Sequence, residues 1–212
     1  MAIKAQFITL EGIEGAGKST LARALESALR ARGLDVVLTR EPGGTPLAEK
    51  LRTLVLARGS ERISASAETL MMFAARAVHV DNLIRPALEN GRWVICDRFT
   101  DATRAYQGAG RGVDLTFIDQ LAASVHADLW PDRTLLLDLP VAVGLTRARA
   151  RPAGGDRFED EDLRFFERVR ACYHSIAANE PARVRILDAS VDAARLAEHA
   201  LHAINDLLAD HD

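Results

Sequence analysis

Cysteine and long apolar runs are scarce in this chain of 212 residues. It has two cysteines, Cys96 in an apolar run and Cys172 in a helical pattern, and their spacing matches no zinc site. We therefore expect reduced thiols inside a protein core rather than a disulfide framework or a metal centre. No apolar run approaches the roughly 20 residues that a membrane-spanning helix needs. Both absences favour a cytoplasmic protein with no membrane partner.

A large excess of charge of either sign is also missing. Lys and Arg number 27 and Asp and Glu number 30, so the formal net charge is -3. A general nucleic-acid binder usually carries a basic excess, so we expect no nucleic-acid partner, although a local basic pocket for small anions stays open. Internal repeats and low-complexity segments are absent too. With 48% apolar residues, the chain fits one α/β domain over residues 1–212.

The most informative motif is a glycine-rich stretch near the N-terminus. An apolar strand from Phe7 to Leu10 leads into residues 12–19, which read G-x-x-x-x-G-K-S, and a helical apolar pattern follows. In such a P-loop the backbone N–H groups surround phosphate oxygens, the lysine reaches the outer phosphates and the hydroxyl binds Mg²⁺. The alternative is a glycine-rich turn that binds nothing. The candidate residues for the nucleotide phosphates are Gly12, Glu14, Gly15, Ala16, Gly17, Lys18, Ser19 and Thr20.

Apolar strands alternate with helical patterns along the rest of the chain. Further strands are predicted at 34–39, 93–96, 134–138 and 184–188. Helices are predicted from Lys18, at 46–58, at 65–90 with a break near Pro86, at about 100–108, and at 115–127, 140–150, 159–179 and the C-terminus. We expect Gly108, Gly110 and Gly112 to loosen the connection after 100–108. This alternation predicts a P-loop NTPase fold, a three-layer α/β/α arrangement around a five-stranded parallel sheet. Ligands then bind at the carboxyl ends of the strands.

The strand at 93–96 ends in Asp97-Arg98, a loose form of the Walker B pattern. An aspartate there lies near the phosphates and can hold Mg²⁺, so Ser19 and Asp97 are the candidate metal ligands. The arginine can hold a second anion. Glu14 is unusual, because it places a carboxylate in a loop that gathers positive potential for phosphates. It either meets a hydroxyl or ammonium group of a second substrate or faces solvent at a variable position.

An arginine-rich loop follows the helix at 140–150. Arg147, Arg149, Arg151 and Arg157 flank a segment interrupted by Pro and Gly. Such a segment can act as a mobile lid, at about 147–159, whose arginines stabilise the charge on a transferred phosphoryl group. The alternative is a solvated charged face. On the long helix, Phe73 and Arg76 lie one turn apart, which suits a nucleobase or, alternatively, a core position.

Taken together, these motifs resemble the thymidylate kinase family. The matching pieces cover nearly the whole chain in order: residues 11–20, 39–45 (Thr-Arg-Glu-Pro-Gly-Gly-Thr), 73–76, 97–99, 105–108 (Ala-Tyr-Gln-Gly), 110–112 and 147–159. The resemblance implies transfer of the γ-phosphoryl group of ATP to dTMP, which gives dTDP and ADP, with Mg²⁺ as a cofactor. It also implies a homodimer.

The resemblance implies a role for individual residues as well. Glu14 matches the residue that meets the sugar 3′-hydroxyl, and Tyr106 matches the one packed under the deoxyribose. The match to the stacking aromatic lies at Met72, and we expect Phe73 to take that role. Arg52 and Arg98 match contacts near the acceptor phosphate, and Arg76, Thr103 and Gln107 match contacts to thymine.

The P-loop contains no arginine, which resembles the form of the family whose catalytic arginine lies in the lid. Arg151 is the best match, supported by Arg147 and Arg149 at the nucleotide. The expected catalytic residues are Lys18, Asp97, Arg98 and Arg151.

No base-like histidine accompanies these motifs, and none is needed, because a phosphate monoester with a second pKa of about 6 arrives largely as an anion. Two alternatives remain: another nucleoside monophosphate or small-molecule kinase on the same scaffold, and a regulatory P-loop NTPase. Against the second alternative, the chain lacks the guanine-reading Asn-Lys-x-Asp motif. A regulatory NTPase also gives no reason for an arginine lid.

Overall fold

A single parallel sheet organises this computed structural model, which describes residues 5–58, 61–150, 157–158 and 161–209. Within those residues the sheet has five strands in the order β2-β3-β1-β4-β5. The central strand β1 (Phe7–Glu11) pairs with β3 (Trp93–Asp97) and β4 (Arg133–Asp138), and β2 (Val36–Arg40) and β5 (Val184–Asp188) form the edges. All pairings are parallel, which confirms the predicted α/β class.

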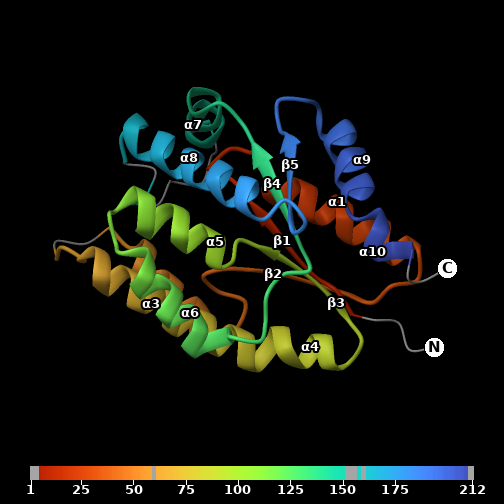
Figure 1. Cartoon of the computed structure of the whole chain (residues 1–212), viewed down its shortest axis with the longest axis horizontal. Helices are drawn as coiled ribbons and strands as arrows, with labels where there is room; N and C mark the ends of the chain where they lie inside the picture. The colour runs from red at the N-terminus through yellow and green to blue at the C-terminus, as the bar shows by residue number, and fades with distance from the viewer. Residues whose placement is uncertain (1–4, 59–60, 151–156, 159–160, 210–212) are drawn as a thin grey trace.

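Helices cover both faces of the sheet (Figure 1). One face carries α1 (Lys18–Ala31), α9 (Ala193–Ala203) and α10 (Asn205–Ala209), and the other carries α3 (Ala65–His79), α4 (Arg85–Glu89), α6 (Leu115–His126) and α8 (Leu163–Asn179). The strands divide their side chains between the faces with a period of two. Ile8 and Leu10 pack with α1, whereas Phe7 packs with Ile84 on the opposite side. The sheet is therefore buried on both faces, as parallel sheets usually are.

Several helix ends follow directly from the sequence. The first helix begins at Lys18 after Gly17 and ends before Gly33, and both glycines have positive φ. The helix α2 (Pro46–Leu56) starts after Thr45, whose hydroxyl accepts a hydrogen bond from Ala48 N, with proline in the first helical position. Among the described helices none combines the length and the apolar character that a bilayer-spanning segment requires.

The helix predicted over 65–90, with a break near Pro86, is interrupted just before that proline. The regular helix α3 ends at His79, a π-helical segment η1 spans Val80–Ile84, and α4 starts at Arg85. Proline lacks an N–H group and its ring clashes with the carbonyl four residues earlier, so the ladder widens in the turn before Pro86. The break therefore lies N-terminal to the proline.

The glycines after residue 100 act differently from the expectation. The helix α5 (Thr100–Thr103) continues into a π-helical segment η2 (Arg104–Gly110), so Gly108 and Gly110 lie inside a helix. A Cβ atom on Gly108 would lie 2.7 Å from Leu115 Cδ2, and one on Gly110 would lie 2.5 Å from Phe165 Cε2. These two glycines permit close packing against α6 and α8 instead of loosening the chain. Of the three, Gly112 has the positive φ that a turn requires.

Candidate active site

A cavity of about 290 Å³ opens at the carboxyl ends of β1 and β3. Its lining combines segments that are far apart in the sequence: the P-loop, the turn after β2, α2, α3, the end of β3, η2 and Phe158. Most of the predicted site residues line it, namely Glu14, Gly15, Gly17, Lys18, Ser19, Arg52, Arg76, Asp97, Arg98, Thr103, Tyr106 and Gln107. The geometry therefore brings the expected donor and acceptor residues to one place.

The backbone of the P-loop depends on glycine at two close approaches. A Cβ atom on Gly12 would lie 2.5 Å from Leu137 O, and one on Gly15 would lie 2.0 Å from Gly144 O in α7 (Val141–Arg149). Both residues also have positive φ. Ala16 is buried and Thr20 is exposed, and neither they nor Gly12 line the cavity. For these three residues, contact with the nucleotide phosphates stays a prediction.

The side chain of Lys18 folds back onto the P-loop and binds its backbone. Its Nζ donates to Gly12 O at 2.9 Å and to Ile13 O at 3.0 Å, and the residue is buried. Burial, with a further contribution from the charge of Arg98, lowers the pKa of Lys18 to about 8. An anion in the loop would compensate both effects, which fits a lysine whose partner is phosphate.

The two candidate metal ligands meet across the sheet. Ser19 Oγ donates to Asp97 Oδ2 at 3.1 Å. This approach follows from topology, because Leu10 pairs with Asp97 in the sheet and the loop after β1 turns toward β3. A hydroxyl and a carboxylate are oxygen ligands of the kind that Mg²⁺ prefers.

Glu14 lies at the centre of a polar cluster instead of facing solvent. Its Oε1 accepts from Arg98 Nη2 at 2.8 Å, and its Oε2 accepts from the Tyr106 hydroxyl at 2.7 Å. The Arg98 guanidinium also lies 4.5 Å from the centre of the Tyr106 ring. The three side chains come from the P-loop, the end of β3 and η2, so they join the donor loop to the other half of the cavity.

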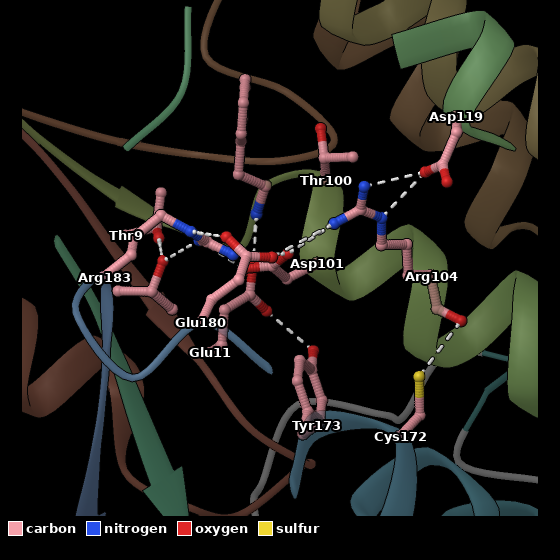
Figure 2. Close-up of polar contacts among 12 residues, drawn as sticks. Thr9, Glu11, Thr100, Asp101, Arg104, Asp119, Cys172, Tyr173, Glu180 and Arg183 are labelled. Atoms are coloured by element: carbon pink, nitrogen blue, oxygen red, sulfur yellow. Dashed lines mark hydrogen bonds and ion pairs between the residues drawn. The ribbon is translucent and has the colours of Figure 1, made fainter. Parts of the chain in front are cut away.

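Glu11, which the sequence analysis did not select, fixes the turn that presents Arg98. Arg98 has φ 74, the one positive value at a non-glycine residue in the described part of the chain. Glu11 Oε1 accepts from Phe99 N at 2.7 Å, and Arg98 N donates to Leu10 O at 2.9 Å. The Glu11 carboxylate also accepts from the Tyr173 hydroxyl at 2.7 Å, as Figure 2 shows. The sequence does contain one signal for Glu11, which is a charged residue at the end of a mainly apolar strand.

Burial, together with repulsion from Asp101, raises the pKa of Glu11 to about 7. Asp101 is in turn paired with Arg183, whose Nη1 lies 2.7 Å from Asp101 Oδ2 and donates to Thr134 Oγ1 at 2.7 Å (Figure 2). The hydroxyl groups of Thr134 and Thr9 lie 2.7 Å apart. This buried network joins β1 to β4.

The residues predicted to contact a base lie on α3, α5 and η2. Arg76 Nη2 donates to Thr103 Oγ1 at 3.0 Å, and Gln107 Nε2 donates to Glu68 Oε1 at 2.7 Å. Arg52 Nη1 donates to Pro42 O at 2.8 Å. These contacts hold the side chains of this half of the cavity in fixed directions.

Phe73 does not occupy the predicted stacking position. It is 2% exposed, packs with Ile118 and Ala122, and does not line the cavity. Met72 lines the cavity in its place. Helical geometry explains the correction, because residues at i and i+4 lie on one face, and this spacing relates Met72 to Arg76.

The lid arginines are placed unequally. Arg147 and Arg149 are exposed in the last turn of α7 and do not line the cavity, and Arg147 donates to Ala189 O at 3.2 Å. Arg157 is bound by Glu68 and by Val55 O. Arg151 lies outside the described residues. Phe158, which the sequence analysis did not select, lines the cavity with its ring centre 6.0 Å from that of Tyr106.

Comparison with known proteins identifies similar chains. A family model described as thymidylate kinase matches residues 10–199. The chain is 59% identical to a thymidylate kinase of Teredinibacter turnerae over 178 residues, which cover 84% of this chain and 86% of that relative. It is 54% identical to a thymidylate kinase of Pseudomonas fluorescens over 202 residues, which cover 95% and 94%. The crystal structure of a thymidylate kinase from Ehrlichia chaffeensis matches with a TM-score of 0.77 and 34% identity, over 94% of this chain and 98% of that one.

Proposed function

The chain belongs to the thymidylate kinase family, and on that premise we propose that its cavity transfers the γ-phosphoryl group of ATP to dTMP, which gives dTDP and ADP. The chain is thus a nucleoside monophosphate kinase, a phosphotransferase. The observation that carries the assignment is the joining of two half-sites. Arg98 and Glu14 connect the P-loop to a pocket lined by Arg76, Thr103 and Gln107. A regulatory NTPase has no acceptor substrate and would not need the second half-site.

The residues act mainly by position and charge. The ATP phosphates lie on the P-loop, with Lys18 at the outer phosphates, and dTMP lies between Tyr106 and the base-facing residues. Arg98 and Arg52 bind the acceptor phosphate, and Glu14 accepts from the sugar 3′-hydroxyl. The acceptor is already anionic, so no side chain has to remove a proton from it. The remaining task is to align two repelling anions and to neutralise the charge that develops between them.

Ser19 and Asp97 would hold Mg²⁺, which supplies charge neutralisation at the ATP phosphates when it is bound. Their oxygen atoms fit this role. Lys18 and Arg98 supply the remaining positive charge from the chain itself. Residues 147–159 act as a lid in this proposal, with Arg151 as the catalytic arginine and Arg147 and Arg149 near the nucleotide.

We further propose a cytoplasmic homodimer without nucleic-acid or membrane partners. The support is the family and the balanced charge of the chain. The exposed leucines on α2, α3 and α6, which are Leu54, Leu70 and Leu115, offer apolar surface that a second copy would cover.

The test is ADP release measured with a panel of nucleoside monophosphates. We expect the highest kcat/KM for dTMP and a clearly lower value for the ribonucleotide UMP, because Tyr106 and Glu14 crowd the sugar. Lys18→Ala is the control for contaminating kinases, and it should lower kcat by at least about two orders of magnitude while the domain stays folded. Equal kcat/KM values across the panel would reject dTMP as the acceptor. Full activity of Lys18→Ala would reject the P-loop as the donor site.

A further inference from the structure

We propose that His79 and Glu41 are positioning residues that hold the guanidinium group of Arg76, so that one of its nitrogen atoms, Nη1, is directed at the acceptor base. The inference rests on the proposed function, because it assumes that a base occupies this half of the cavity. It assigns a role to the Thr39–Thr45 motif, which the chemistry of phosphoryl transfer leaves unexplained.

Arg76 is held on four sides. Its Nε donates to Glu41 Oε2 at 2.7 Å and its Nη2 donates to Thr103 Oγ1 at 3.0 Å. The rings of Phe73 and Phe99 lie 4.7 Å and 5.1 Å from its central carbon. The side chain is therefore fixed in both plane and direction.

One nitrogen atom of Arg76 has no partner among the described residues. The residue is 3% exposed and lines the cavity, and its buried Nη1 has no hydrogen-bond partner among the residues that the structure describes. A buried charged donor without a partner is costly, so a ligand acceptor is the natural completion of the site.

Glu41 is oriented in turn by His79. Burial opposes the charge of Glu41, but Arg76 and then His79 hold the pKa of this carboxyl below its ordinary value. An ionised carboxylate can only accept, so His79 Nδ1 donates to Glu41 Oε1 at 3.1 Å. Nε2 of the same ring lies 2.7 Å from the Thr39 hydroxyl oxygen, within hydrogen-bond distance. His79 is completely buried, so water does not replace these contacts.

Gly44 leaves the space for this pair. A Cβ atom there would lie 2.4 Å from His79 Nε2 and 2.5 Å from Thr39 Oγ1, and the residue has φ 86. Thr39, Glu41 and Gly44 thus serve one purpose, which is to fix Arg76.

A fixed guanidinium donor discriminates by chemistry. Arginine has donors and no acceptor, so Nη1 binds a carbonyl oxygen and rejects an amino group in the same place. A guanidinium free to rotate would discriminate less. The loss of His79 should therefore weaken binding of dTMP and reduce its advantage over 5-methyl-dCMP, which carries an amino group in place of one carbonyl.

The experiment compares dTMP and 5-methyl-dCMP in the wild type, His79→Leu and His79→Gln. We expect His79→Leu to raise KM for dTMP by roughly tenfold and to lower the dTMP preference by a similar factor, with KM for ATP within twofold, as for the loss of a charged hydrogen bond. His79→Gln retains a donor and an acceptor and should recover most of the loss. An unchanged preference in folded His79→Leu would overturn the inference.

A second pair of variants keeps the test decisive if His79→Leu does not fold. Thr39→Val and Thr9→Val are the same substitution, and each removes a buried hydroxyl contact of 2.7 Å, but only the first contact leads to Arg76. We expect about a threefold loss of preference in Thr39→Val and none in Thr9→Val. Equal preference in the two variants would overturn the inference. A wild type without preference for dTMP would instead overturn the proposed function.

Discussion

At the scale of a single side chain, Glu11 makes the folding stability depend on pH. Its native pKa is about 7, raised from 4.5 by burial and by Asp101. Between these two values the native state keeps a proton that the unfolded chain has released, so stability falls as the pH rises. The shift corresponds to about 3 kcal/mol at 1.36 kcal/mol per unit.

We predict that Glu11→Gln removes this component. The difference in unfolding free energy between the wild type and the variant, measured by urea denaturation, should decrease by about 3 kcal/mol from pH 4.5 to pH 7.5. Glu198→Gln, at an exposed position on α9, is the control and should leave the pH dependence unchanged. Parallel curves for the wild type and Glu11→Gln would contradict the prediction.

At this scale, the sequence predicts residues whose neighbours lie close in the chain. The roles of Gly12, Lys18 and Ser19 follow from one local motif. Glu11 has its partners 88 and 162 residues away, at Phe99 and Tyr173. No local pattern carries that information, so such support residues appear only once the strands are placed side by side.

At the scale of elements, the conformation of the P-loop depends on its contact with α7. The backbones of Gly15 and Gly144 approach so closely that a Cβ atom on either glycine would meet the other segment. The donor site is therefore supported by the helix that leads into the arginine-rich segment.

We predict that Gly15→Ala displaces α7 and nearly abolishes activity. The new Cβ atom would lie 2.0 Å from Gly144 O at a residue with φ 76, and we expect a loss of at least about 2 kcal/mol of stability. Gly33→Ala is the matched control, because it has φ 83 and no atom within 4 Å of the new Cβ. It should cost only the conformational strain, about 1 kcal/mol, and retain kcat. Urea denaturation and steady-state rates distinguish the two, and equal effects would contradict the contact argument.

The regular elements were predictable, and the π-helical segments were not. Every strand was expected, because each is a short, mainly apolar segment between turn residues or helical patterns. The segments η1 and η2 have the same apolar spacing as ordinary helices over one turn, so periodicity cannot distinguish them. Glycine within η2 was interpreted as a loop signal, whereas Phe165 and Leu115 require it for packing.

At the scale of the whole molecule, the proposed mechanism draws a cation from the arginine-rich lid. Arg157 is bound to Glu68 and Arg147 donates to Ala189 O, so these two lid arginines have partners outside the P-loop. We predict that Arg151→Ala lowers kcat by roughly two orders of magnitude with little change in either KM, scaled down from the effect of an arginine finger. Steady-state kinetics with Arg149→Ala as the comparison would measure this. An intact kcat after replacement of Arg147, Arg149, Arg151 and Arg157 together would reject the lid mechanism.

The acceptor half of the site was only partly predictable at this scale. The motifs placed Arg76, Thr103 and Gln107 in it through resemblance, but the choice between Met72 and Phe73 needed the rotation of α3 about its axis. Phe158 was out of reach, because the Pro- and Gly-rich sequence before it has no helical or strand periodicity.

Glu68 connects Gln107, in the acceptor half of the site, to Arg157, in the predicted lid. It is completely buried, accepts from Gln107 at 2.7 Å and from Arg157 at 2.5 Å, and lies 3.5 Å from Arg111 Nε. A base that engages Gln107 and a nucleotide that moves Arg157 therefore act on one carboxylate, so their affinities are thermodynamically linked. Whatever factor dTMP imposes on the dissociation constant of such a nucleotide, the nucleotide must impose the same factor on that of dTMP.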